Sequence, residues 1–251
     1  MSRIRTKTPD ELERMRASGR LAAQVREAVG REVRPGVTTA ELDAFARDLI
    51  ARLGAKSSFL GYRGYPGHVC VSVNEEVVHG IPGPRRIAIG DIVSLDVGVY
   101  FEGFHGDTAK TVMVGVTDPD VVRLVSVTQR ALDAGIAQAR AGGFLSDVSH
   151  AIETVSVQAG FSVVRSFVGH GIGRDMHEPP EIPNYGPPGR GPLLKPGMTL
   201  AIEPMVNLGR YEVETLADGW TVVTRDRRPS AHWEHTVAVG VDGPEILTRA
   251  D

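Results

Sequence analysis

The chain has 251 residues, of which 41% are apolar and 24% are charged, and its 28 basic and 31 acidic side chains leave a formal charge of −3. This composition is that of an ordinary globular protein and excludes disordered, collagen-like and coiled-coil chains. The near balance of charge gives no general positive field for DNA or anionic membranes. The single cysteine excludes an internal disulfide, and no stretch approaches the roughly 18 apolar residues of a membrane span, so we expect a cytoplasmic protein without a membrane partner.

Two helices and three strands are predicted in the first half of the chain. Thr8-Pro9-Asp10-Glu11 is typical of a capping box with proline in the first turn, and it begins a helix that ends before Pro35-Gly36. A second box predicts a helix between Thr38 and Gly54. Runs of β-branched residues predict strands at 69–73, 91–99 and 108–114.

The second half repeats this order of helices and strands. Asp118-Pro119 predicts a helix that runs to about Arg140, and Ser146 is the predicted cap of a fourth helix that Gly160 ends. Strands are predicted at 161–168, 198–205, 220–224 and 232–239. Segment 171–197 is rich in proline and glycine and is interpreted as a functional loop.

The two halves share a faint internal repeat. Each half has a helix that begins after one glycine and ends at another, and a strand that begins at a glycine and reaches a carboxylate six residues later. The matched pairs are Gly36 and Gly142, Gly54 and Gly160, Gly90 and Gly197, and Asp96 and Glu203, at offsets of 106, 106, 107 and 107 residues. We therefore expect one pseudo-symmetric domain over residues 1–251, with halves at roughly 36–114 and 142–239.

Four acidic residues interrupt or adjoin predicted strands. They are Asp96, Asp107, Glu203 and Glu234. An isolated ionised carboxylate in a buried strand is costly, and each of these acids, taken alone, fits the solvent face of an antiparallel sheet. All four together, two of them at equivalent places in the repeat, favour a compensating positive charge at a shared site.

Divalent metal ions are the natural compensating charge, and His170 is the candidate imidazole ligand. Oxygen ligands with one imidazole suit Mn, Fe, Co or Zn. Two such ions would balance four carboxylates and ionise a bridging water to hydroxide, the nucleophile of two-metal hydrolases. His170 lies between two glycines, so a histidine in a glycine turn is the alternative interpretation.

Two further histidines have specific surroundings. His79 ends an apolar strand before a Gly/Pro turn, and His177 lies seven residues after His170. Neutral imidazoles beside a metal centre can bind a substrate amide or stabilise an oxyanion. The alternative for each is a hydrogen-bonded loop histidine, and this is our interpretation of the remaining five, His68, His105, His150, His232 and His235.

Seven short segments together resemble one enzyme family. They are GYRGYP at 61–66, SVNEEVVHGIP at 72–82, GDIVSLD at 90–96, GFHGD at 103–107, GHGIGR at 169–174, IEPM at 202–205 and EHTV at 234–237. In these segments, and along nearly its whole length, the chain is similar to the type I methionine aminopeptidases of the short bacterial form. The resemblance implies an α+β fold of the pita-bread type, with two pseudo-symmetric halves and an antiparallel sheet covered by helices.

The resemblance also implies the site residues and the reaction. The implied metal ligands are Asp96, Asp107, His170, Glu203 and Glu234, holding two divalent ions (Co, Mn, Fe, Ni or Zn), with Asp107 and Glu234 bridging. Glu203 would also shuttle a proton, His79 would contact the scissile amide, and His177 would stabilise the tetrahedral intermediate. The implied substrates are nascent chains and peptides with N-terminal methionine and a small second residue, whose scissile carbonyl the bridging hydroxide attacks.

The implied methionine pocket is lined by aromatic rings and by polarisable sulfur atoms. Its residues would be Phe59, Tyr62, Tyr65, Cys70, Met176 and Trp220. Aromatic rings and a thiol are suitable neighbours for a thioether. Phe59 departs from the family pattern, since some relatives carry cysteine there, so pocket size and sensitivity to thiol reagents are left open.

Two rival interpretations remain. A pita-bread peptidase that cuts beside proline, such as aminopeptidase P or prolidase, usually has an extra N-terminal domain, for which the residues before Thr8 leave no room. A non-catalytic module that binds protein or RNA is disfavoured by the complete set of ligands and histidines. The resemblance implies a monomer, and the cluster at Arg225, Arg227 and Arg228 is interpreted as a solvated turn, with contact to the ribosome surface as an alternative.

Overall fold

The computed structural model describes residues 4–250. Within this range, each pair of helices is followed by a run of strands, in the predicted order. The helices are α1 (Pro9–Glu32), α2 (Thr39–Arg52), α3 (Pro119–Gln138) and α4 (Leu145–Gln158), with a 3-10 turn at Tyr62–Gly64. The strands are β1 (Lys56–Ser57), β2 (Cys70–Val73), β3 (Glu76–Val78), β4 (Ile92–Phe101), β5 (Phe104–Met113), β6 (Ser162–Val163), β7 (Gly169–Gly171), β8 (Glu178–Ile182), β9 (Thr199–Ile202), β10 (Met205–Asn207), β11 (Val213–Thr215), β12 (Val222–Thr224), β13 (Ser230–His232), β14 (Glu234–Val239) and β15 (Pro244–Ile246).

The main sheet has the strand order β1-β4-β5-β14-β9-β7-β8, with β2 added beside β4 and β15 beside β14. Its central hairpin joins β4 to β5, and both residues of the connecting turn, Glu102 and Gly103, have positive φ, as a tight hairpin turn requires. Two smaller three-stranded sheets, β13-β10-β6 and β11-β12-β3, flank the main one.

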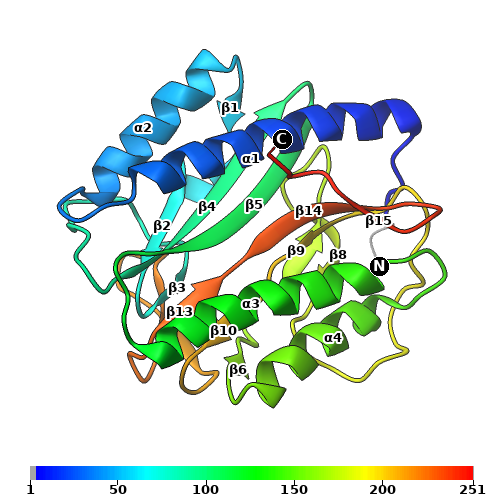
Figure 1. Ribbon diagram of the computed structural model, residues 1–251. Coiled ribbons are helices and arrows are strands. Elements are labelled where there is room, and N and C mark those ends of the chain that lie inside the picture. Colours follow the sequence, from blue (N-terminus) through cyan, green and yellow to red (C-terminus); the bar gives the residue numbers. More distant parts are fainter. Residues whose placement is uncertain (1–3, 251) are drawn as a thin grey trace.

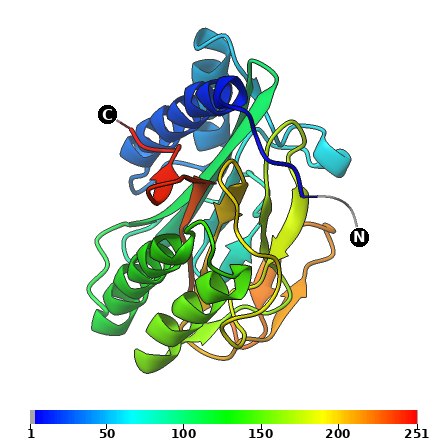
Figure 2. The same cartoon turned by 90° about the vertical axis from the view of Figure 1, so that its right-hand side faces the viewer.

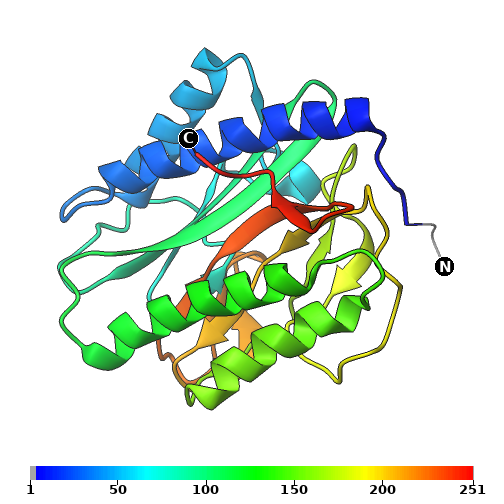
Figure 3. The same ribbon diagram turned by 45° about the vertical axis from the view of Figure 1, so that its right-hand side comes forward.

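Helices cover one face of the main sheet. Figure 1 shows α1 crossing the long β4–β5 hairpin and α3 running beside β14, and the turned views in Figures 2 and 3 place both helices on the same side of the strands. The predicted capping boxes at Thr8 and Thr38 begin α1 and α2, and each threonine hydroxyl accepts a hydrogen bond from the amide of the glutamate three residues later. The predicted α+β class, with an antiparallel sheet under helices, is confirmed.

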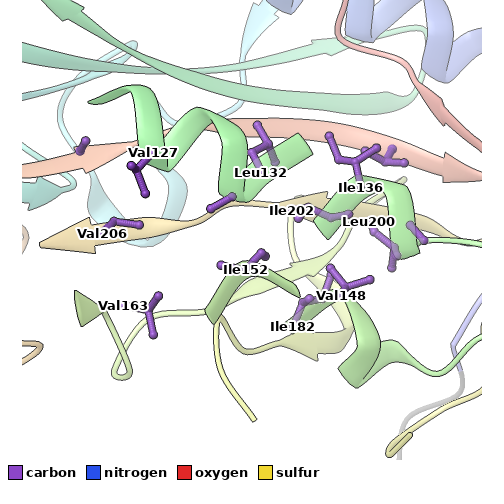
Figure 4. Packing of buried hydrophobic residues seen from close by; sticks show 14 of the residues in the cluster. Val127, Leu132, Ile136, Val148, Ile152, Val163, Ile182, Leu200, Ile202 and Val206 are labelled. Carbon is purple, nitrogen blue, oxygen red and sulfur yellow. The ribbon is translucent and has the colours of Figure 1, made fainter. Parts of the chain in front are cut away.

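Each half of the chain packs its helices on its own strands. In the second half, Leu132 and Ile136 of α3 and Ile152 of α4 meet Leu200 and Ile202 of β9 (Figure 4), and all five are buried. In the first half, buried valines and leucines of α1, α2, β2 and β4 form a separate cluster. The opposite face of the sheet is thus free for polar side chains.

Equivalent backbone contacts occur in the two halves of the chain, at the spacing of the internal repeat. The amide of Gly36 donates to the carbonyl of Ile87 at 2.8 Å, and the amide of Gly142 donates to the carbonyl of Leu194 at 2.9 Å. An isolated bridge pairs Thr38 with Arg86, and its counterpart pairs Phe144 with Leu193. These contacts recur at offsets of 106 and 107 residues, so they support the prediction of two related halves in one domain.

Several predicted boundaries are wrong; for example, the strand predicted at 108–114 is β5, which begins at Phe104. Helix α4 begins at Leu145, one residue before the predicted cap Ser146, whose hydroxyl instead accepts a hydrogen bond from the amide of Arg190. The predicted strand 161–168 is reduced to β6, and the predicted loop 171–197 contains β8, which pairs with β7. Within residues 4–250, no helix combines the length and apolarity needed to cross a membrane.

Candidate active site

Five neighbouring strands of the main sheet bring together the five predicted metal ligands. Asp96 lies on β4, Asp107 on β5, Glu234 on β14 and His170 on β7, and Glu203 directly follows β9. The sheet order β4-β5-β14-β9-β7 therefore contributes one ligand per strand. Residues that are distant in the sequence become neighbours because these strands pair side by side.

The strand register places three of the carboxylates on the same face of the sheet. Asp96 of β4 and Glu234 of β14 both lie opposite Ala109 of β5. Asp107 is two residues from Ala109 on the same strand, so its side chain points to the same side. Because paired residues share a face, Asp96, Asp107 and Glu234 all leave the sheet in one direction.

The other two ligands follow the same rule. Ile202 lies opposite His235, so Glu203 comes to lie across from Glu234. His170 lies opposite Ala201, which is two residues from Glu203 and shares its face. A slip of one residue in any of these pairings would turn the ligand to the helix-covered face.

The side-chain atoms converge on a small volume. The Nε2 atom of His170 is 3.8 Å from Oδ2 of Asp107 and 3.6 Å from Oε1 of Glu203. Ligand atoms of Asp107, His170 and Glu234 lie within 4.8 Å of one another. The Nδ1 atom of His170 donates to the carbonyl of Gly171 at 2.8 Å, which leaves Nε2 facing the carboxylates, and burial lowers the pKa of His170 to about 4.

The carboxylates are buried without enough partners. Oxygen atoms of Asp96, Asp107 and Glu234 are buried and have no hydrogen-bond partner among the described residues. Burial, then repulsion between the acids, raises the pKa of Asp107, Glu203 and Glu234, and burial raises the pKa of Asp96 to about 7. Such a cluster is unfavourable by itself, and four carboxylates with one neutral imidazole are a donor set that suits divalent cations.

A threonine on β14 fixes the backbone of one ligand. The Thr236 hydroxyl accepts a hydrogen bond from the amide of Asp107 at 3.0 Å and donates one to the carbonyl of Asp107 at 2.8 Å. Thr236 is fully buried. These two bonds hold β5 against β14 at the position where the Asp107 carboxylate leaves the strand.

A cavity of about 120 Å³ opens directly above these ligands. All thirteen residues predicted for the site line it. They are Phe59, Tyr62, Tyr65, Cys70, His79, Asp96, Asp107, His170, Met176, His177, Glu203, Trp220 and Glu234. The structure thus brings the expected ligands, histidines and pocket residues together around one space, while the role of each stays a prediction.

The apolar side of the cavity is built from rings in edge contact. The Tyr65 ring meets the Trp220 ring edge-on at 5.1 Å and the Phe59 ring at 6.5 Å. Cys70 pairs with Asp96 across β2 and β4 and is buried as a free thiol. A slot of aromatic edges, a thiol and the buried Met176 suits an unbranched apolar side chain.

The two predicted catalytic histidines lie at different depths. Burial lowers the pKa of His79 to about 4, and its backbone has a φ of 60°, a strained value for a residue with a side chain. His177 is exposed at the mouth, where its ring stacks on Tyr62 at 5.2 Å and lies 4.0 Å from the ring of His170. Desolvation, then the neighbouring His170 and the charge of Arg63, lower the pKa of His177, so both imidazoles are neutral near pH 7.

Two residues that line or adjoin the cavity were not singled out from the sequence. Arg63 lies at the mouth of the cavity, and its guanidinium is 5.4 Å from the centre of the Tyr62 ring. In the sequence, its position between the two predicted pocket tyrosines could have indicated this role. His232, interpreted above as a hydrogen-bonded loop histidine, instead lies on β13 with Nε2 buried, unpartnered among the described residues and 3.8 Å from Oε2 of Glu203. That interpretation of His232 is wrong, and the loop assignment is also wrong for His105 on β5, His150 on α4 and His235 on β14.

Comparisons with known proteins agree with this geometry. The profile of metallopeptidase family M24 matches residues 13–240. The chain is 53% identical to methionine aminopeptidase 1 of Bacillus subtilis, over 97% of this chain and 98% of that protein, and 47% identical to the methionine aminopeptidase of Escherichia coli K12, over 98% and 94%. The crystal structure of methionine aminopeptidase from Thermotoga maritima superposes with a TM-score of 0.97 at 46% identity, over 98% of this chain and 100% of that one.

Proposed function

The chain belongs to metallopeptidase family M24, and we propose that it is a methionine aminopeptidase, a hydrolase that removes the N-terminal methionine from peptides whose second residue is small. The observation that carries this proposal is the single cavity in which a thioether-sized apolar slot adjoins four carboxylates and an imidazole. An apolar slot suits the side chain of methionine, and the neighbouring acidic cluster supports cleavage of the adjoining peptide bond.

The five predicted ligands Asp96, Asp107, His170, Glu203 and Glu234 would hold two divalent ions. When bound, such ions lower the pKa of a coordinated water and polarise a carbonyl group. The buried, unpartnered oxygens support this assignment because they need a cation to offset their charge. The sequence leaves Co, Mn, Fe, Ni and Zn as candidates.

The residues around the cavity have separable roles in the proposed reaction. Glu203 accepts a proton from the attacking water and returns it to the leaving amine, which requires a carboxylate next to both. His177 donates a hydrogen bond at the mouth to the developing oxyanion, and the deeper His79 contacts the scissile amide. The neutral state of both imidazoles keeps an N–H available for donation near pH 7.

A panel of Met-Xaa-Ser peptides tests the proposal. Release of methionine is expected with glycine, alanine and serine at the second position, and little release with leucine or arginine. Cleavage of an Xaa-Pro peptide in preference to Met-Ala-Ser would instead assign the chain to the proline-specific branch, which shares this fold, as a TM-score of 0.81 to the prolidase of Pyrococcus furiosus at 21% identity shows.

We also expect the enzyme to act in the cytoplasm as a monomer on nascent chains. The absence of a membrane-spanning helix in residues 4–250 and the single cysteine are compatible with this location. Light scattering measures the mass against 27.0 kDa for one chain. Co-sedimentation with ribosomes, compared between the wild type and a variant with Arg225, Arg227 and Arg228 changed to glutamine, tests contact with the ribosome surface.

A further inference from the structure

A buried ion pair connects the N-terminal segment to the turn that carries His177. The Lys7 ammonium lies 2.7 Å from Oε2 of Glu178, and both side chains are only 5% exposed. The two residues are 171 positions apart in the sequence. Few ion pairs on this protein are so well shielded from water, and Lys7 and Glu178 have no part in the proposed chemistry, so the pair needs a separate explanation.

The second oxygen of Glu178 organises the turn itself. Oε1 accepts hydrogen bonds from the backbone amides of Arg174 at 2.9 Å and Asp175 at 3.3 Å. The carboxylate therefore joins the start of the turn to its end, while Lys7 occupies the other oxygen. The residues enclosed between these anchors include Met176 and His177, which line the cavity.

The surrounding backbone is shaped to admit the pair. A Cβ atom on Gly173 would lie 2.5 Å from Oε1 of Glu178 and 2.5 Å from Cε of Lys7, so a larger residue there would force the ion pair to shift. The amide of Lys7 donates to the carbonyl of Gly197 at 2.7 Å, which fixes the segment before α1 to the strand region that precedes β9. The lysine is thus held at its backbone and at its charged end.

We propose that Glu178, held by Lys7, is a positioning residue that fixes the turn 173–178 and so places His177 for the reaction; this inference rests on the proposed peptidase function. The ring of His177 lies at the exposed mouth, where its only ring neighbours among the described residues are Tyr62 and His170. The position of the His177 ring is therefore set mainly by the backbone of the turn that carries it. A displacement of about 1 Å in such a group can reduce turnover about 100-fold.

Two double variants distinguish a positioning role of Glu178 from a general effect on the stability of the protein. Lys7→Met/Glu178→Gln and Lys7→Met/Glu178→Leu both remove the buried ion pair without leaving an unpaired charge, so their melting temperatures are expected to lie within a few degrees of each other. The glutamine still offers a side-chain oxygen to the amides of Arg174 and Asp175, whereas the leucine does not. We expect kcat on Met-Ala-Ser to stay within about threefold of wild type in the first and to fall at least about tenfold in the second, with KM changed less than threefold in both.

Hydrogen exchange and a His177→Ala background complete the test. Amide exchange across 173–178 should be faster in the leucine double variant than in the glutamine one. If Glu178 acts through His177, the leucine change lowers kcat little further in His177→Ala. Arg174→Gln, which removes the exposed 3.1 Å contact to Glu11 from the same turn, is the matched control and should leave kcat unchanged.

Equal kcat in the two double variants, or an undiminished tenfold loss in the His177→Ala background, would overturn the inference. A wild-type protein that releases no methionine with any metal would refute the proposed function instead. Faster exchange at 173–178 in the leucine variant is independent of that activity, so the two failures can be told apart.

Discussion

The phenol of Tyr65 donates a hydrogen bond of 2.9 Å to the carbonyl of Gly80, the residue next to His79. The same oxygen lies 3.2 Å from the carbonyl of Val69, and the Tyr65 ring forms part of the apolar wall of the cavity. One side chain thus holds both the apolar wall and the strained backbone of His79 in place.

Tyr65→Phe is expected to lower the free energy of unfolding by about 1 kcal/mol, because a buried hydrogen bond to the carbonyl of Gly80 is lost, although that carbonyl still accepts from the amide of Val71. It should also reduce kcat several-fold, because His79 is less constrained. Denaturant unfolding and steady-state kinetics measure the two effects. Tyr211→Phe, at a residue that is 40% exposed, is the control and should change neither.

Glu203→Gln is expected to lower kcat on Met-Ala-Ser by at least about 100-fold, because the amide cannot take and return the proton. His79→Ala should cause a similar loss through the missing contact to the scissile amide. Circular dichroism should show folded protein in both. Turnover near the wild-type rate in either variant would remove that residue from the proposed mechanism.

Metal removal should abolish turnover and destabilise the fold. Saturation at about 100 times the Kd contributes about 2.7 kcal/mol, or roughly 5–10 °C in Tm for a chain of this size. A chelator titration followed by Mn, Co or Fe, with Tm and activity read in parallel, measures this. Asp107→Asn should raise the Tm of the metal-free protein above pH 5, since it removes one member of the repelling cluster, and should lose the metal-dependent increase.

The free thiol of Cys70 should resist alkylation in the folded enzyme. Burial raises the pKa of Cys70 well above its usual value, so little thiolate forms at neutral pH. Iodoacetamide at pH 7.5 is expected to leave activity intact in the wild type, because Cys70 lines the cavity as a buried, neutral thiol. Mass spectrometry identifies the labelled cysteine; modification of Cys70 in native protein would contradict the prediction.

Stability should fall on acidification in part because of His79. Its pKa of about 4 in the folded protein is below the unfolded value of about 6.5, so below pH 6.5 the unfolded chain binds a proton that the folded chain does not. This contribution is fully present above pH 7 and is about 2 kcal/mol smaller at pH 5. Denaturant unfolding at both pH values should show a smaller difference in His79→Gln than in the wild type; equal differences would contradict the assigned pKa.

Short-range patterns were sufficient for most helices, and they singled out the acids that the structure brings to one cavity. The capping boxes at Thr8 and Thr38 are local signals, and both helices begin there. Acids such as Asp96 inside an apolar strand were informative because burial makes an unpaired carboxylate unfavourable. The resemblance to a known family then related the separate segments to one site.

Other features depend on contacts that no single segment contains. Ser146 looks like a helix cap, but the loop at Arg190 uses its hydroxyl, and the helix begins one residue earlier. His232 carries no motif, and its place beside Glu203 follows from strand pairing. The Lys7–Glu178 pair joins residues 171 positions apart, and nothing near either one in the sequence predicts the other.

The sequence by itself determined which chemical groups are available, because residue type fixes charge, donor atoms and local backbone preference. Only the tertiary structure decided which of them meet. The antiparallel register of five strands places all five predicted ligands on one face, and a shift of one residue would turn a side chain to the helix-covered face instead. That register is decided by the packing of the two helix-covered cores, a property of the whole chain.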